Sequence, residues 1–214
     1  MSKFLTKKLV GDILAKAVSE LEKRQEELNR LDAAIGDGDH GTSIVKAMRA
    51  AAEAIRGDGS FKDALYNAGF AAESQDCGST SSLTGSFYEG MSEAVTSEEM
   101  NTDGVIQMFS AGLTCVEQST KAQVGDKTLM DALIPAVNQM KSMIDCNASL
   151  VSVFEAAADA AQFGAESTID YIAKFGRAKN LGERTKGHLD PGAISMAIVF
   201  RTFANHLKTQ TVNG

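Results

Sequence analysis

The chain has 214 residues, of which 43% are hydrophobic and 23% charged, and its net charge is −7. This length and composition predict a single globular domain over residues 1–214, and the negative charge disfavours nucleic acid and anionic lipid as partners. No apolar run is long enough to span a membrane and no apolar signal core follows the N-terminal lysines, so we expect a cytoplasmic protein with no membrane partner.

Helical patterns run through most of the sequence. An amphipathic helix is predicted over residues 3–30, where apolar side chains recur mostly at spacings of three, four or seven. A second is predicted over 42–56 and a third over 60–74, where Ser60 and Asp63 form a variant capping box. Five more are predicted over 80–95, 102–119, 128–144, 149–166 and 191–208, with candidate caps at Asn101 or Thr102, Asp126, Ser149 and Asp190. Because period-two alternation is essentially absent, we predict an all-α fold of eight helices without a sheet, and a longer loop near 175–189.

The segment between the first two predicted helices, residues 31–41 (LDAAIGDGDHG), holds three aspartates within eight residues, interleaved with glycines. Crowded carboxylates repel one another unless a cation lies between them, and hard oxygen ligands suit magnesium or calcium. The alternative is a solvated acidic turn. An EF-hand is a poorer fit, because Thr42 and Met48 stand where that loop needs glycine and glutamate. A dinucleotide-binding reading of Gly36-x-Gly38-x-x-Gly41 is rejected, because a helix precedes it where a strand is required.

Two further segments suggest contacts with phosphate. Residues 77–85 (CGSTSSLTG) are small and hydroxyl-rich and lead into a helix, whose unpaired N–H groups and positive dipole end suit an anion. The alternative there is an ordinary Ser/Thr cap. Residues 125–128 (GDKT) resemble the end of a P-loop but do not form one, because Asp126 separates the glycine from the lysine.

Taken together, these segments resemble the L subunit of dihydroxyacetone kinases. The resemblance rests on residues 31–41, on 125–128 followed by 131–135 (DALIP), and on 176–178 (GRA), 181–184 (LGER) and 187–193 (GHLDPGA). It implies an antiparallel up-and-down barrel of eight helices with the nucleotide site at one end. That fold agrees with the eight helices predicted above.

The resemblance also implies roles for individual residues. Asp32, Asp37 and Asp39 would hold two magnesium ions against the phosphates of ADP or ATP. No catalytic residue is assigned, and either Arg177 or Lys127 is a candidate for an additional cationic contact. Two departures from the family pattern occur, with Ser81 replacing a glycine of the second loop and Thr42-Ser43 standing where many relatives carry an asparagine. The implied nucleotide-binding residues are His40, Gly41, Thr42, Ser43, Gly78, Ser79, Thr80, Leu83, Thr128, Leu129, Arg177, Asp190, Pro191 and Gly192.

The implied activity is phosphoryl transfer to dihydroxyacetone or a related short ketose, which a separate K-type subunit binds covalently through a histidine of its own. Such a reaction needs mainly positioning and charge neutralisation. Two phosphoryl sources stay open: free ATP, or a phosphotransferase-system subunit that rephosphorylates a tightly held ADP. The alternative function is a non-catalytic regulator that carries nucleotide and binds a transcription factor or sensor chain. A homodimer is compatible with all of these functions.

Overall fold

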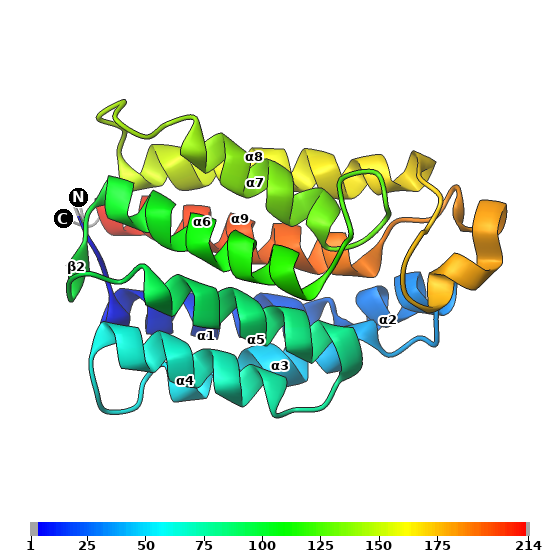
Figure 1. Cartoon of the computed structure of the whole chain (residues 1–214), viewed down its shortest axis with the longest axis horizontal. Helices are drawn as coiled ribbons and strands as arrows, with labels where there is room; N and C mark the ends of the chain where they lie inside the picture. Colours follow the sequence, from blue (N-terminus) through cyan, green and yellow to red (C-terminus); the bar gives the residue numbers. More distant parts are fainter. Residues whose placement is uncertain (1–3, 213–214) are drawn as a thin grey trace.

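The computed structural model describes residues 4–212 of the chain, and this part is predominantly helical (Figure 1). The all-α prediction is therefore confirmed in its main feature. Within the described residues, the α-helices are α1 (Lys7–Lys23), α2 (Gln25–Ala33), α3 (His40–Ala54), α4 (Phe61–Glu73), α5 (Gly78–Glu93), α6 (Thr102–Ser119), α7 (Met130–Lys141), α8 (Leu150–Ser167) and α9 (Pro191–Val212). The predicted loop near 175–189 contains 3-10 turns over Arg177–Thr185, and another 3-10 turn, Thr168–Asp170, follows α8.

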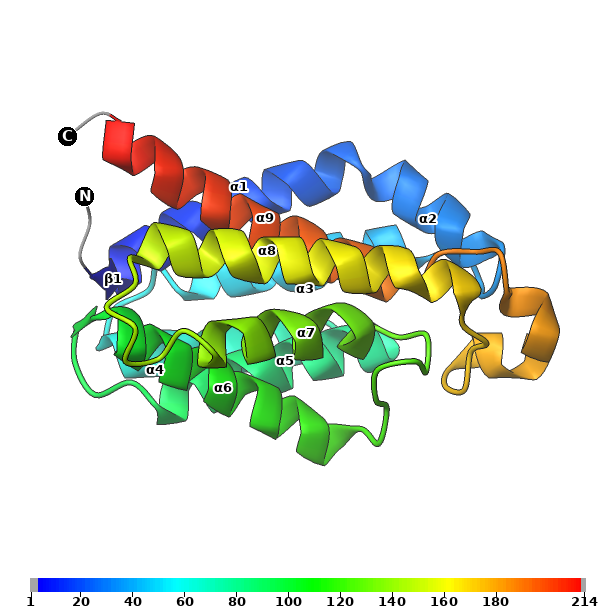
Figure 2. The ribbon, with the colours of Figure 1, turned by 90° about the horizontal axis from the view of Figure 1, so that it is seen from above.

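The single helix predicted over residues 3–30 is wrong, because the chain breaks it at Arg24. Arg24 has φ −106° and ψ 7°, which lie outside the helical region. Its guanidinium donates to both carboxylate oxygens of Glu27, at 2.8 and 2.6 Å, and so stabilises the first turn of a new helix. Figure 2 shows α2 turning away from α1 at this point. The bend allows α2 to pack against α3 and to end within the aspartate-rich segment 31–41.

The expected absence of a sheet also needs a correction. Two short strands, β1 (Leu5–Thr6) and β2 (Glu99–Met100), pair antiparallel, with Leu5 opposite Met100. Two residues are too few to show a period-two pattern, so the sequence carries no signal for them. Thr6 also begins α1, since its hydroxyl accepts the Leu9 N–H at 3.2 Å.

Most of the predicted helix caps are confirmed. In each case a side-chain oxygen accepts the backbone N–H three residues later. These caps are Ser60, Asn101, Ser149 and Asp190. The predicted cap Asp126 is wrong: its carboxylate accepts the Gln123 N–H and binds the Lys174 ammonium. The start of α7 is held instead by Asp131, which accepts the N–H groups of Gly125 and Thr128 at 2.6 and 2.7 Å.

Eight of the helices contact one another in a closed circuit. The order is α1, α3, α4, α5, α6, α7, α8 and α9, and α9 contacts α1 again. An aromatic cluster lies inside this circuit, with the Phe109 ring 5.2 to 5.8 Å from four other rings. No helix in the described part of the chain combines the length and hydropathy that a membrane span needs.

The two ends of this bundle differ. Both termini lie at one end, and the connections α2–α3, α4–α5, α6–α7 and α8–α9 all lie at the other (Figures 1 and 2). The N-terminal ends of α3, α5, α7 and α9 therefore meet at the same end of the molecule. Because a helix N-terminus carries unpaired N–H groups and a partial positive charge, this end is suited to anions.

Candidate functional site

A cavity of about 460 Å³ opens at this end of the bundle, and residues from all four connections line it. The segments found in the sequence, with Asp32 and Gly192 160 residues apart, are thus brought into one site. The predicted site residues that line the cavity are Asp32, Asp37, Asp39, His40, Gly78, Ser79, Thr80, Leu83, Thr128, Leu129, Arg177, Asp190, Pro191 and Gly192.

Three of the predicted site residues do not line the cavity: Gly41, Thr42 and Ser43. Gly41 is buried against α2, where an added Cβ would overlap the Gln25 carbonyl oxygen. Thr42 faces the same helix, with its N–H donating to the Asn29 side-chain oxygen at 3.1 Å and its hydroxyl accepting from the Asn29 amide at 3.2 Å. Gly41 and Thr42 thus join α3 to α2, and Ser43 is buried.

Carboxylates occupy three of the four helix starts around the cavity. Asp32 Oδ2 accepts the N–H groups of Gly38, Asp39 and His40 at 2.8, 2.9 and 3.3 Å, and so caps α3 from a distance in the sequence. Asp131 holds the start of α7, and Asp190 caps α9, as described above. Each buried or half-buried carboxylate accepts one or more N–H groups at or before one helix start.

The start of α5 is different, because no side chain caps it. Among the residues that the structure describes, none accepts a hydrogen bond from the N–H groups of Gly78, Ser79 or Thr80. All three residues line the cavity, and Gly78 and Ser79 are exposed. The start of α5 therefore offers backbone donors to an anion in the cavity.

Ser81, the residue that departs from the family pattern, does not change this donor set. Its side chain is 2% exposed, and its hydroxyl accepts the Cys77 N–H at 2.8 Å and donates to the Gly78 carbonyl at 3.1 Å. These two hydrogen bonds of the Ser81 hydroxyl therefore stabilise the turn at the start of α5. The backbone N–H groups that face the cavity stay available.

Asp32, Asp37 and Asp39 form the acidic side of the cavity. Each offers a carboxylate oxygen, and these atoms lie within 4.8 Å of one another. Partial burial raises the pKa of Asp39, and the neighbouring carboxylates of Asp37 and Asp32 raise it further. Asp32 Oδ1 accepts no hydrogen bond in the described structure, so it stays free to bind a cation. The oxygen donors and their mutual repulsion fit a hard divalent cation.

Gly36 is required by the close approach of Asp32. A Cβ on Gly36 would overlap Asp32 Oδ1, the oxygen left free for a cation. The turn then continues through Gly38, whose φ of +82° favours glycine. The glycines of this segment thus allow the chain to fold back so that all three carboxylates converge.

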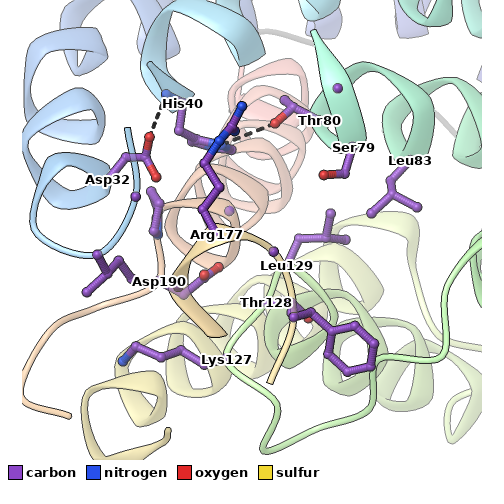
Figure 3. A pocket seen from close by; sticks show the side chains of 18 of the residues that line it. Asp32, His40, Ser79, Thr80, Leu83, Lys127, Thr128, Leu129, Arg177 and Asp190 are labelled. Atoms are coloured by element: carbon purple, nitrogen blue, oxygen red, sulfur yellow. Dashed lines mark hydrogen bonds between the residues drawn. The ribbon is translucent and has the colours of Figure 1, made fainter. Parts of the chain in front are cut away.

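His40 links three helix starts behind the acidic cluster. Its Nε2 lies 2.9 Å from the Ser195 hydroxyl on α9, and its Nδ1 lies 3.4 Å from the Thr80 hydroxyl on α5 (Figure 3). Burial lowers the pKa of His40 to about 4, so the ring is neutral near pH 7. A neutral ring held on both nitrogens is suited to fixing Thr80 and α3 in place.

The two basic side chains considered from the sequence take different positions. Arg177 is 73% exposed and reaches across the cavity mouth to Asp37, with 3.1 Å between Nη1 and Oδ2 (Figure 3). Lys127 is buried, and its ammonium donates to the backbone carbonyls of Thr168 and His188. Only Arg177 has its charged group accessible at the mouth.

Several lining residues were not predicted from the sequence. Cys77 begins the hydroxyl-rich segment 77–85 and Asp76 precedes it, so their positions in the sequence were an available signal. The others carry no distinctive chemistry, and only packing brings them to the cavity. They are Ile35, Thr120, Ala122, Met130, Phe175, Gly176 and Ala178.

The chain is similar in sequence to known proteins. A model of the DAK2 domain matches residues 34–205. The chain is 36% identical over 203 residues to the ADP-binding subunit DhaL of PEP-dependent dihydroxyacetone kinase 2 from Listeria innocua, covering 92% of this chain and 94% of that protein. It is 34% identical over 208 residues to D-erythrulose kinase from Mycolicibacterium smegmatis, covering 94% of this chain but only 35% of that protein.

Solved structures are similar in fold as well. The native dihydroxyacetone kinase of C. freundii superposes with a TM-score of 0.70 at 26% identity, covering 92% of this chain and 34% of that chain. The same enzyme in complex with AMP-PNP and Mg²⁺ gives a TM-score of 0.67 at 24% identity, covering 96% of this chain and 35% of that chain. The chain thus spans about a third of the length of that enzyme.

Proposed function

The chain belongs to the dihydroxyacetone kinase L-subunit family, and from that premise we propose that it binds ADP or ATP through magnesium and delivers a phosphoryl group to a short ketose held by a K-type subunit. The family membership makes it a nucleotide-binding kinase subunit. The identity of the nucleotide, the magnesium ions and the K-type partner subunit are what we propose.

The observation that carries this proposal is the pairing of an uncapped helix start with an acidic cluster across one cavity. The free N–H groups of Gly78, Ser79 and Thr80 suit phosphate oxygens, whereas the three aspartates repel a bare phosphate. A divalent cation between phosphate and carboxylates satisfies both sides. Neither a simple anion site nor a simple cation site explains both features.

We assign magnesium to Asp32, Asp37 and Asp39 as two ions, which when bound would neutralise the charge of the phosphates. The chain's own residues then position the nucleotide. The start of α5 donates N–H groups to phosphate, and Arg177 adds a positive charge at the mouth. Apolar lining at Leu83 and Leu129 is suited to covering a nucleobase.

Three further parts of the proposal concern the arrangement of the helices, the phosphoryl donor and the ketose. We propose that the closed circuit of helices is an antiparallel up-and-down barrel of eight helices, with α2 as a continuation of α1 after its break. The phosphoryl donor is either ATP or a phosphotransferase-system subunit, in line with the PEP-dependent relative. The ketose is dihydroxyacetone or a tetrulose, since relatives named for both occur.

Binding of MgADP should raise the melting temperature. A ligand that binds only the native state at a hundredfold excess over its dissociation constant adds about 2.7 kcal/mol of stability. For a chain of this size that corresponds to a shift of about 5–10 °C. Differential scanning fluorimetry with ADP and magnesium should show the shift, and excess chelator should remove it. An unchanged melting temperature at millimolar MgADP would contradict the proposal.

A further inference from the structure

Lys127 is a buried lysine that lines the cavity, with 2% of its surface exposed. It lies in the connection between α6 and α7 and has a left-handed backbone with φ +60°, which is uncommon for a residue that carries a Cβ. Gly125, two residues earlier, also has a positive φ, of +96°. Lysine is almost never fully buried without partners, so both the conformation and the burial call for an explanation.

The partners of the ammonium are two backbone carbonyls from distant parts of the chain. One belongs to Thr168, in the 3-10 turn after α8, at 2.5 Å, and the other to His188, in the segment before α9. These acceptors lie 41 and 61 residues away in the sequence. The Thr168 hydroxyl in turn accepts the Asp190 N–H at 2.9 Å. A single ammonium thus joins three segments that meet at the cavity.

The joined segments are two walls of the cavity. Thr128 and Leu129, directly after Lys127, form one wall, and the start of α9 from Asp190 forms the other. Figure 3 shows Lys127 below both walls, on the side away from Ser79 and Thr80. Movement of Lys127 would therefore displace both the Thr128–Leu129 wall and the wall formed by the start of α9 from Asp190.

The charge of Lys127 has no carboxylate paired with it. Within the described residues it forms no salt bridge, although Asp190, Asp131 and Asp170 lie close enough to favour its charged form. Burial lowers the pKa of Lys127, whereas burial raises that of Asp190 to about 6. The ammonium is thus a buried positive charge near the carboxylates of Asp190, Asp131 and Asp170.

We propose that Lys127 is a positioning residue for the nucleotide, holding the Thr128–Leu129 wall against the Asp190 wall from below without contacting phosphate. This inference rests on the proposed function. It replaces the direct cationic contact for which Lys127 was a candidate, because two of the three N–H donors of the ammonium are directed to the Thr168 and His188 carbonyls.

The test compares Lys127→Met with Lys121→Met in the whole chain. Methionine has a similar length without charge or donors, and Lys121 is exposed in the same connection. Calorimetry with MgADP, well below the melting temperature, separates the affinity from the number of functional sites. We expect the dissociation constant of Lys127→Met to rise by about 10-fold or more, with one nucleotide still bound per chain, whereas Lys121→Met matches the wild type.

A role confined to general stability would reduce the number of functional sites and leave the affinity unchanged. A dissociation constant of Lys127→Met within twofold of the wild-type value would therefore overturn the inference, whatever its melting temperature. If Lys127→Met does not fold, the dissociation constant of Lys127→Gln, which keeps an N–H donor, is compared with the wild-type value instead. The same twofold limit applies. Loss of the fold in both variants would make Lys127 a folding requirement and also overturn it. Failure of the wild type and Lys121→Met to bind MgADP would overturn the proposed function itself.

Discussion

Replacing Asp37 or Asp39 with alanine is expected to abolish nucleotide retention. Each change removes one of the converging carboxylates, and neither side chain caps a helix, so the effect should fall on the cation site. Changes to residues behind a metal ligand typically cost 10–100-fold in affinity, so loss of a ligand should weaken MgADP binding by about 100-fold or more. Calorimetry with ADP in the presence of magnesium measures this directly.

The matched control is Asp159→Ala, which removes an aspartate paired with Arg201 on the outer surface and should leave affinity unchanged. Metal-free stability gives a second control. Since the Asp39 carboxylate accepts no hydrogen bond in the described structure and lies beside two like charges, metal-free Asp39→Ala should melt no lower than wild type. Unchanged MgADP affinity in both site variants would overturn the metal assignment.

Asp32→Ala should behave differently from the other two. Asp32 accepts three backbone N–H groups, so its loss leaves those donors unpaired and loosens the start of α3. Hydrogen bonds to a charged group contribute about 1.5–3 kcal/mol each, and part of that is lost here. We therefore expect Asp32→Ala to lose both nucleotide binding and stability in the metal-free state.

Phosphorylation of a ketose should require a second protein. The cavity holds one histidine side chain from the described residues, His40, and both of its ring nitrogens already face hydroxyl groups. No group in this site resembles the covalent sugar site of a K-type subunit. The chain alone, with MgATP and dihydroxyacetone or a tetrulose, should show no turnover, and a K-type subunit should restore it. A coupled assay for ketose phosphate measures both.

The K-type subunit needs a positive control, which is its activity with an L subunit already shown to work with it. Turnover by the isolated chain would contradict the two-subunit proposal. If an active K-type subunit and a phosphotransferase-system donor both fail to restore turnover while MgADP still binds, the regulator alternative becomes the better account.

The sequence predicted the acidic side of the site because the chemistry there is local. Three aspartates spaced by glycines lie within eight residues, and the turn that brings them together needs few distant contacts. The helix caps were predictable for the same reason, since each is completed three residues later. Where capping depends on a more distant residue, as for Asp32 on α3, local patterns gave no indication.

The features that the sequence did not predict depend on tertiary packing. The break at Arg24 places α2 against α3, and no proline or glycine marks it. Lys127 was predicted from the sequence only as a candidate for a cationic contact, because its partners Thr168 and His188 lie far away in the chain. Similarly, Phe175 and Ala122 line the cavity only because distant segments meet there.

The most direct test of the account is mass spectrometry of the purified protein under native conditions, before and after removal of magnesium by a chelator. We expect a bound mass equal to ADP or ATP with magnesium before chelation, and the bare chain afterwards. A protein that carries no nucleotide and takes up none when ADP and magnesium are added would contradict it. So would a nucleotide that stays bound after magnesium has been removed.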